Sequence, residues 1–273
     1  MKPRHFPATH PDDVSRLTYR ESRDRFVVTN LFIGGEIRFA HTEYERLFVG
    51  GLCPNGGTLS LPNLPDLDAD YFLERREMGV VALTGSGTVV ADGVDYAMRA
   101  HDVLYLGRGT QEVSFSGDAE YYTVSAAAHR AEPATLSRRE DAESVEFGTT
   151  EGANRRTIRK HIHPGGVLSN HITLGVTTLH NGSVWNTMPP HIHERRTEIY
   201  MYFDLAGAIV QHTMGIPGDT RTISLGDKDV IISPPWSIHT GSGTGAYSFV
   251  WATAGENMTY NDNRPISPAD LRS

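Results

Sequence analysis

The segment from Met188 to Phe203 contains three side chains with the chemistry and spacing of a metal site: His191, His193 and Glu198. Residues i and i+2 of a β-strand point to the same face, so the two imidazoles would lie side by side. A turn through the four intervening residues can return the carboxylate beside them on the next strand. Two imidazoles and one carboxylate suit Zn, Fe, Mn or Ni. The chain offers a fourth ligand at His239.

A second interpretation of the same pair is structural, with one imidazole exposed and the other hydrogen-bonded in the protein core. A His-x-His pair that stands alone favours that interpretation. Here a carboxylate and a third imidazole, Glu198 and His239, accompany the pair at offsets that suit a shared ion. The sequence therefore predicts a metal site.

Another His-x-His pair, His161 and His163, lacks these companions. Residues 164–166 (Pro-Gly-Gly) follow it, and no carboxylate stands at the corresponding distance. We therefore expect these two imidazoles to be exposed. Three further histidines without a partner at ligand spacing are expected to be structural: His171, His180 and His212.

Composition bounds the class of protein. The chain has 273 residues, 38% hydrophobic and 9% aromatic, which is enough for a sizeable core. Its net charge is −8 and its Lys and Arg residues are scattered, which argues against a nucleic-acid or anionic-membrane surface. The single cysteine, Cys53, permits no intrachain disulfide and fits a reducing compartment. Without a signal-peptide core or a long apolar run, we expect a soluble, cytoplasmic protein.

Beyond a short N-terminal helix at residues 10–24, the chain consists of short β-branched and aromatic runs interrupted by Gly, Pro, Asn or Asp. This texture is typical of an all-β sandwich or barrel. A polar stretch near the middle reads as a linker between two β regions. The sequence is divided accordingly into an N-terminal helical arm, a metal-free half, a linker, a metal-binding half and a C-terminal tail: residues 1–25, 26–130, 131–156, 157–262 and 263–273.

The two β regions resemble each other, which indicates an internal repeat. Residues 71–78 align with residues 191–198 and share the tripeptide Glu-Arg-Arg. Further on, Asp102-Val103 aligns with Asp229-Val230. The ligand positions of the first half then carry side chains of which three are poor ligands for a hard or borderline cation: Tyr71, Leu73, Met78 and Glu112. One half should bind metal and the other should not.

On these motifs the chain resembles the cupin superfamily of small β-barrels. The His-x-His pair and the glutamate five residues later match its first motif, and Gly207 lies near the closing glycine. The proline and histidine of Pro234–His239 match its second motif, with Trp236 where glycine is usual. The resemblance implies an all-β fold of two cupin-like barrels, a bicupin, with few helices besides the N-terminal one.

A closer resemblance is carried by WNTMPPHIHERRTEIYMYF, SPPWSIHTGSGTGAYSFVW and AGEN, together with YFLERREMGV, VGG and NRRTI earlier in the chain. These segments are similar to the 5-keto-4-deoxyuronate isomerases, also called 4-deoxy-L-threo-5-hexosulose-uronate ketol-isomerases, from about Phe26 to Asp262. The resemblance implies one Zn²⁺ per subunit, although this ligand set accepts other divalent metals. It also implies a homohexamer that acts on a small-molecule uronate in the breakdown of pectin-derived or related unsaturated uronates.

The reaction that the resemblance implies is an intramolecular oxidation and reduction. It converts 5-dehydro-4-deoxy-D-glucuronate to 3-deoxy-D-glycero-2,5-hexodiulosonate through an enediolate. A cation held by His191, His193, Glu198 and His239 would stabilise the charge of that enediolate. The proton carrier is not evident from the sequence. Glu198 is one candidate and Tyr202 is another, because Tyr200 and Tyr202 share its strand parity.

The substrate carboxylate also needs a cationic partner. Arg195 and Arg196 are candidates, but the first half retains the same Glu-Arg-Arg sequence without the ligands, which favours a structural role for the tripeptide. We therefore expect Arg156 and Lys160 to bind the carboxylate. Trp236 is either a wall of the pocket or an ordinary core residue.

Two other functions are compatible with the sequence. Three histidines and one glutamate also serve Fe(II) chemistry in cupin dioxygenases, and a sugar-binding cupin without catalysis is the third possibility. Metal content and oxygen uptake would separate the isomerase from the dioxygenase. The complete ligand set and the lack of a DNA-binding segment disfavour the third.

Overall fold

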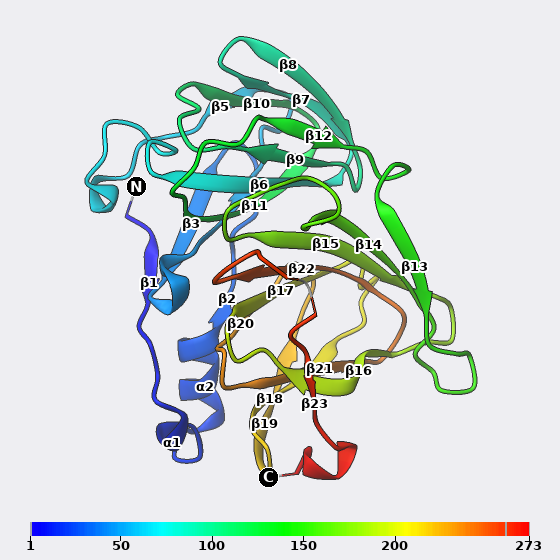
Figure 1. Cartoon of the computed structure of the whole chain (residues 1–273). Coiled ribbons are helices and arrows are strands. Elements are labelled where there is room, and N and C mark those ends of the chain that lie inside the picture. Colours follow the sequence, from blue (N-terminus) through cyan, green and yellow to red (C-terminus); the bar gives the residue numbers. More distant parts are fainter. Residues whose placement is uncertain (1, 260, 273) are drawn as a thin grey trace.

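The computed structural model describes residues 2–259 and 261–272. They form four β-sheets stacked in layers, two from each half of the chain (Figure 1). The outer sheet of the first half has four strands, in the order β5 (Thr58–Ser60), β10 (Val113–Gly117), β7 (Ser86–Ala91), β8 (Val94–Arg99). Its inner sheet has seven, in the order β1 (Arg4–Phe6), β3 (Ile37–Thr42), β4 (Phe48–Leu52), β11 (Glu120–Ala127), β6 (Arg76–Thr84), β9 (Val103–Leu106), β12 (Thr135–Ser137).

The second half repeats this plan. Its inner seven-stranded sheet has the order β13 (Glu143–Phe147), β14 (Arg156–Ile162), β15 (Thr173–Leu179), β22 (Ser248–Ala254), β17 (Thr197–Phe203), β20 (Val230–Ser233), β2 (Val27–Val28). Its outer sheet has the order β19 (Asp219–Leu225), β18 (Val210–Ile216), β21 (Ile238–Gly243), β16 (Trp185–Ile192), β23 (Arg264–Pro265). The strands β4, β11, β6 and β9 thus hold the positions that β15, β22, β17 and β20 hold in the other half.

The register predicted for the repeat agrees with this arrangement. Val103 begins β9 and Val230 begins β20. The aspartate before each valine accepts a hydrogen bond from the backbone N–H three residues earlier, Asp102 at 2.9 Å from Arg99 N and Asp229 at 2.9 Å from Gly226 N. The same turn therefore starts the same strand in both halves.

Three hydrophobic clusters make up the core. One lies between the two seven-stranded sheets, and one fills the interior of each half. Strand β17 shows how alternation divides its side chains: Ile199 and Met201 join the cluster between the sheets, whereas Tyr200 and Tyr202 join the interior of the second half. In the first half, the interior cluster includes Leu73 and Met78, at the positions where the second half has the predicted ligands His193 and Glu198.

The N-terminal arm differs in detail from the single helix that the sequence predicts over residues 10–24. Two short helices are present, α1 (Pro11–Val14) and α2 (Tyr19–Phe26). Thr18 lies between the two helices and forms a capping box with Glu21, which starts the second helix. No helix in the described ranges of the chain has the length and apolar character to cross a bilayer.

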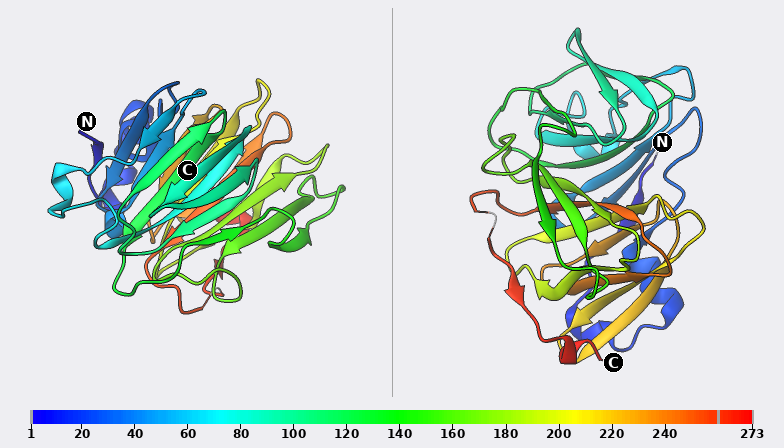
Figure 2. Two further views of the ribbon diagram at one scale, coloured as in Figure 1. Left: turned by 90° about the horizontal axis from the view of Figure 1, so that it is seen from above. Right: turned by 90° about the vertical axis from the view of Figure 1, so that its right-hand side faces the viewer.

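The first strand, β1, pairs with β3 of the first half, whereas the N-terminal helices and the C-terminal tail pack on the second half (Figures 1 and 2). Phe26 at the end of α2 packs edge-on against Trp236, and β2 then pairs with β20. The stretch expected as a linker, residues 131–156, is not free of structure: β12 adds to the sheet of the first half and β13 to that of the second. The C-terminal tail forms β23 and a 3₁₀ turn, Pro268–Asp270.

A buried carboxyl group joins the two halves. Glu77 on β6 is 0% exposed and accepts hydrogen bonds from three consecutive backbone N–H groups of the second half: Asn170 at 2.7 Å, His171 at 2.7 Å and Ile172 at 2.9 Å. The hydroxyl of Tyr105 donates to it at 2.7 Å. One side chain of the first half thus satisfies a backbone segment of the second.

Candidate metal centre

The four predicted ligands converge. His191 lies on β16 with His193 just beyond it, Glu198 lies on β17 and His239 on β21. Nε2 of His191 lies 3.1 Å from Nε2 of both other histidines, and Oε2 of Glu198 lies 3.0 Å from Nε2 of His193 and 2.7 Å from Nε2 of His239. The strand pairing explains part of this, because His191 and His239 are direct partners between β16 and β21.

These separations fit a single ion. Nitrogen and oxygen ligands bind zinc at about 2.0–2.2 Å, so neighbouring ligands on one ion lie about 3 Å apart. All four ligand atoms lie within 4.8 Å of one another, and within the part of the chain that the structure describes this is the one such group of histidine, cysteine and acidic side chains. The residues can therefore hold a divalent cation.

Hydrogen bonds on the far side of the His193 and His239 rings support this assignment. Nδ1 of His193 lies 2.9 Å from Oδ1 of Asp262, and Nδ1 of His239 lies 3.4 Å from the carbonyl oxygen of Ser237. An Nδ1–H donated to these oxygens leaves the lone pair on Nε2, which faces the other ligands. Both imidazoles are therefore held in the tautomer that a metal ligand requires.

The electrostatics of the site favour positive charge beside His193. Burial alone would lower the pKa of His193, but the carboxylates of Glu198 and Asp262 raise it to about 9. Burial, reinforced by His239, lowers the pKa of His191 to about 3. Burial would raise the pKa of Glu198, yet His239 and His193 hold it well below its usual value. A proton and a metal cation are attracted by the same two carboxylates.

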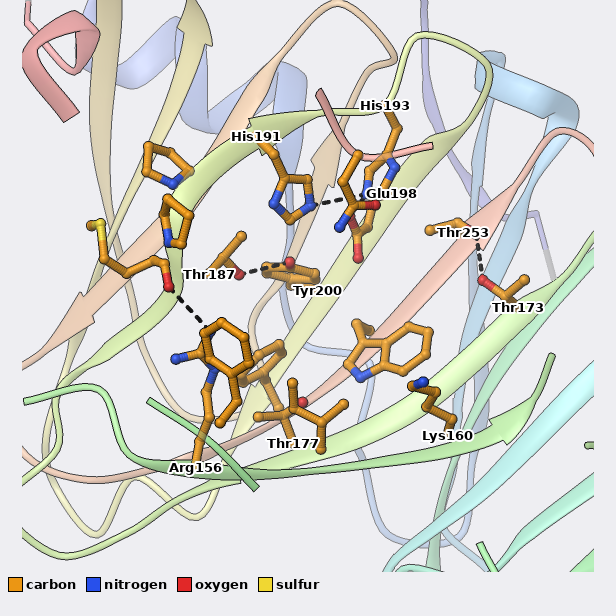
Figure 3. A pocket seen from close by; sticks show the side chains of 18 of the residues that line it. Arg156, Lys160, Thr173, Thr177, Thr187, His191, His193, Glu198, Tyr200 and Thr253 are labelled. Atoms are coloured by element: carbon orange, nitrogen blue, oxygen red, sulfur yellow. Dashed lines mark hydrogen bonds and ion pairs between the residues drawn. The ribbon is translucent and has the colours of Figure 1, made fainter. Parts of the chain in front are cut away.

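A cavity of about 360 Å³ opens from this centre, and three of the four ligands line it (Figure 3). Arg156 and Lys160 line the cavity from β14, which lies in the same sheet as Glu198 and opposite the sheet that carries His191 and His239. Aromatic and hydroxyl side chains make up half of the remaining lining: Phe147, Thr173, Thr177, Thr187, Tyr200, Phe249, Trp251 and Thr253. The wall thus combines a metal-type ligand set with cationic groups at a distance from it.

The two predicted carboxylate partners differ in their surroundings. Arg156 is 5% exposed, donates to the carbonyl oxygens of Asn154 at 2.8 Å and Met188 at 3.4 Å, and lies over the ring of Phe147. Burial lowers its pKa. Lys160 instead forms an ion pair of 2.7 Å with Glu143. The guanidinium of Arg156 is the more rigidly placed of the two cations.

The aromatic candidates differ in whether they reach the cavity. The hydroxyl of Tyr200 lies in the cavity 2.9 Å from Oγ1 of Thr187 (Figure 3). Tyr202 and Trp236 are absent from the described residues that line the cavity. The Tyr202 hydroxyl lies deeper, 2.8 Å from Nδ1 of His212, and burial raises its pKa well above 10. The parity argument placed both tyrosines on the correct face, but depth decides which one reaches the cavity.

The other His-x-His pair is not exposed, which corrects the expectation from the sequence. His161 and His163 are 1% and 5% exposed. Nδ1 of His161 lies 2.8 Å from Oγ of Ser137 on β12, and Nε2 of His163 lies 3.5 Å from Glu143 on β13. The strands of the supposed linker cover both rings, a tertiary contact that the local sequence does not encode.

Burial of His161 gives a pH dependence. It lowers the pKa of His161 to about 4, against an ordinary value of about 6.5 in the unfolded chain. The neutral form therefore stabilises the fold above about pH 6.5, and this contribution is lost as the pH falls towards 4. We expect Tm to fall across that window, less steeply in His161→Asn, whose amide can still bond Ser137. Identical pH profiles of Tm for the two proteins would contradict this assignment.

Two residues beside the predicted ligands were not predicted in their present roles. Asp262, at the end of the expected metal-binding half, contacts His193, and Arg196 of the Glu-Arg-Arg tripeptide pairs with Asp262. The structural role expected for the tripeptide as an ion pair is consistent with this geometry. The equivalent Arg76 of the first half is also buried, but it donates to Ser125 and Arg46 instead.

Comparison with known proteins adds sequence relatives over almost the whole chain. The family model described as "KduI/IolB family" matches residues 64–266. Proteins named 4-deoxy-L-threo-5-hexosulose-uronate ketol-isomerase are 46% identical in Cereibacter sphaeroides and 44% in Agrobacterium fabrum, each over 266 residues and 97% of both chains.

Solved structures agree on the fold. An IolB-like protein from Salmonella typhimurium has a TM-score of 0.72 at 16% identity, covering 88% of this chain and 96% of its own. Oxalate decarboxylase from Lactobacillus farciminis has a TM-score of 0.61 at 12% identity, covering 88% and 89%. At these identities the likeness shows the fold alone, and the predicted all-β fold of two cupin-like barrels is confirmed.

Proposed function

Because this chain belongs to the KduI/IolB family, we propose that its cavity is the active site of a metal-dependent ketol-isomerase. Relatives at 46% identity over 97% of the chain support the enzyme class, an intramolecular oxidoreductase. The observation that carries the proposal is the convergence of three imidazoles and one carboxylate at a cavity with a buried arginine on its opposite wall.

The proposed reaction converts 5-dehydro-4-deoxy-D-glucuronate to 3-deoxy-D-glycero-2,5-hexodiulosonate. It moves the carbonyl from C1 to C2, so one proton leaves C2 and one is added at C1, while a hydroxyl proton passes between the two oxygens. No external oxidant or reductant is needed. Zinc, one ion per subunit, is the metal that we propose for His191, His193, Glu198 and His239. When bound, it would supply Lewis-acid stabilisation of the negative charge that develops on the substrate oxygens.

The protein's own residues then have to move the protons. The hydroxyl of Tyr200 at the cavity wall shares a hydrogen bond with the hydroxyl of Thr187, and either group can donate or accept a proton. Glu198 stays a candidate for the carbon-bound proton, since its carboxylate also borders the cavity. Tyr202 supports Tyr200 from behind, with ring centroids 6.1 Å apart.

Arg156 is proposed to bind the far carboxylate of the substrate. A charge-assisted hydrogen bond of this kind contributes about 1.5–3 kcal/mol, so Arg156→Gln should raise KM about 10- to 100-fold. Because the carboxylate is remote from the reacting carbons, we expect a smaller change in kcat. Steady-state kinetics on the uronate measures both.

Two variants serve as comparisons for Arg156→Gln. The neighbouring Arg155 has a half-exposed side chain near Glu146 and lies outside the cavity lining, so Arg155→Gln should leave KM unchanged. Lys160→Gln should have an intermediate effect, since Glu143 already neutralises part of its charge. A KM for Arg156→Gln equal to that of Arg155→Gln would remove Arg156 from the substrate site.

The decisive experiment supplies the product of an unsaturated-uronate hydrolase to zinc-loaded protein and follows loss of the aldehyde signal by NMR. We expect conversion to the ketose without oxygen uptake. Lack of conversion would refute the isomerase proposal, and oxygen consumption with iron in the purified protein would favour the dioxygenase. The hexameric assembly and cytoplasmic location implied by the family are part of the same proposal, and sedimentation of the purified protein tests the former.

A further inference from the structure

The C-terminal segment, residues 261–272, runs across the metal side of the cavity. Its strand β23 pairs with β16 beside the ligand pair, with Pro265 opposite His191 and Arg264 opposite Ile192. Asn263 and Pro265 line the cavity. The segment is therefore built into the site, although its sequence reads as a tail (Figures 1 and 2).

Backbone hydrogen bonds fix this course at several points. The N–H of Ile266 donates to the carbonyl oxygen of Pro190 at 2.9 Å. Further along, the carbonyl oxygens of Asp270 and Arg272 accept from Gly218 at 2.9 Å and Thr220 at 3.2 Å, on the hairpin between β18 and β19. The segment is thus attached to both ends of the outer sheet of the second half.

Asp262 is the residue that this segment delivers to the ligands. Its Oδ1 lies 2.9 Å from Nδ1 of His193, and its Oδ2 accepts from Nε of Arg196 at 3.0 Å. A second bond joins Nη2 of Arg196 to Oδ1, so the guanidinium holds the carboxylate with two donors. The side chains of Asp262 and Arg196 are 5% and 1% exposed, so bulk water has little access to this pair.

We propose that Asp262 is a positioning residue for the metal centre. Its carboxylate accepts the Nδ1–H of His193, fixes the orientation and tautomer of the ring, and increases the electron density on Nε2. Arg196 in turn holds the carboxylate in place. The affinity of the centre for metal therefore depends on a residue 69 positions from the ligand that it orients. This inference rests on the proposed function of the four ligands.

A purely structural role for Asp262 makes a different prediction. If the carboxylate only anchored the C-terminal segment through Arg196, its loss would lower the Tm of the metal-free protein and leave the dissociation constant for zinc unaltered. If it positions His193, the dissociation constant must change. Zinc affinity is thus the measurement that separates the two roles.

The test measures zinc affinity by competition with a chelating dye, together with Tm of the metal-free protein. Partners of this kind typically contribute 10- to 100-fold to metal affinity, so Asp262→Ala should weaken zinc binding by about that factor. Asp262→Asn keeps one oxygen that can accept from Nδ1 but loses the negative charge, and it should weaken zinc binding about tenfold. Arg264→Gln changes an exposed side chain of the same segment and is the matched control, with an unchanged dissociation constant.

Each possible result either supports or overturns the positioning role of Asp262. Zinc binding by folded Asp262→Ala within threefold of the wild type overturns the inference, whatever happens to Tm. If Asp262→Ala does not fold, the same criterion applies to Asp262→Asn, which preserves the shape of the side chain. A wild-type protein that binds no zinc or other divalent metal refutes the proposed metal centre and this inference with it. Weak binding by the Asp262 variants beside a normal Arg264→Gln supports it.

Discussion

His239→Ala is expected to abolish stoichiometric zinc binding and to lower kcat/KM about a thousandfold. The imidazole is 1% exposed, and its Nε2 lies 2.7 Å from Glu198 and 3.1 Å from His191. Among the described residues, no fifth histidine, cysteine or acidic side chain belongs to this group. Lewis-acid stabilisation contributes several kcal/mol to such reactions, and about 4 kcal/mol corresponds to three orders of magnitude in rate. Elemental analysis and kinetics on the uronate check the two effects together.

A surface histidine provides the control. The ring of His10 is 67% exposed and accepts a hydrogen bond from Asp12 N at the start of α1, a role that Asn can also fill. His10→Asn should therefore retain zinc and full activity. Normal turnover by metal-free, folded His239→Ala would show that the reaction does not use this centre, and the proposed mechanism would be withdrawn.

Glu77→Ala, outside the lining of the cavity, is expected to cause a large loss of stability. The change deprives the backbone N–H of buried Ile172, the N–H groups of half-buried Asn170 and His171, and the Tyr105 hydroxyl of their common acceptor. Each unsatisfied buried donor costs about 1–3 kcal/mol. With partial relaxation we expect a total of about 3–5 kcal/mol and a fall in Tm of about 10 °C for a chain of this size. Differential scanning calorimetry measures the change.

Two further variants locate the cause of that loss. Glu77→Gln keeps one acceptor oxygen and should fall between Glu77→Ala and the wild type. Glu36→Gln removes a half-exposed carboxylate that pairs with Arg38 at 2.8 Å, and surface pairs of this kind contribute little. Equal Tm values for Glu77→Ala and Glu36→Gln would mean that the contact between the halves is not important for stability.

The convergence of the four predicted ligands was predictable because its signal is local and specific. His191 and His193 share a strand face, Glu198 follows at fixed spacing, and the degenerate copy at residues 71–78 separates ligands from barrel residues. The same reasoning identified the two-barrel fold, since the aligned halves have strands in equivalent positions. Strand periodicity and an internal repeat are properties that a single sequence carries.

The contacts that complete the site depend on chain segments far apart in the sequence. Asp262 lies beyond the second barrel and has no motif around it, so only the course of the C-terminal segment shows that it reaches His193. Glu77 likewise looks like one more charge in Glu-Arg-Arg-Glu. Ser137 contacts His161 only because residues 135–137 form β12, a three-residue strand inside a polar stretch that the sequence does not mark as a strand.

The position of β2 has a consequence for the order in which the molecule can assemble. Val27 and Val28 leave the ribosome early, but their partners Ile231 and Val230 are made some two hundred residues later. During synthesis the N-terminal arm must therefore wait, with Phe26 unprotected until Trp236 appears. Long-range pairings of this kind delay folding. The strand made nearly first is thus paired nearly last, and the second half is not a complete folding unit without the N-terminal arm.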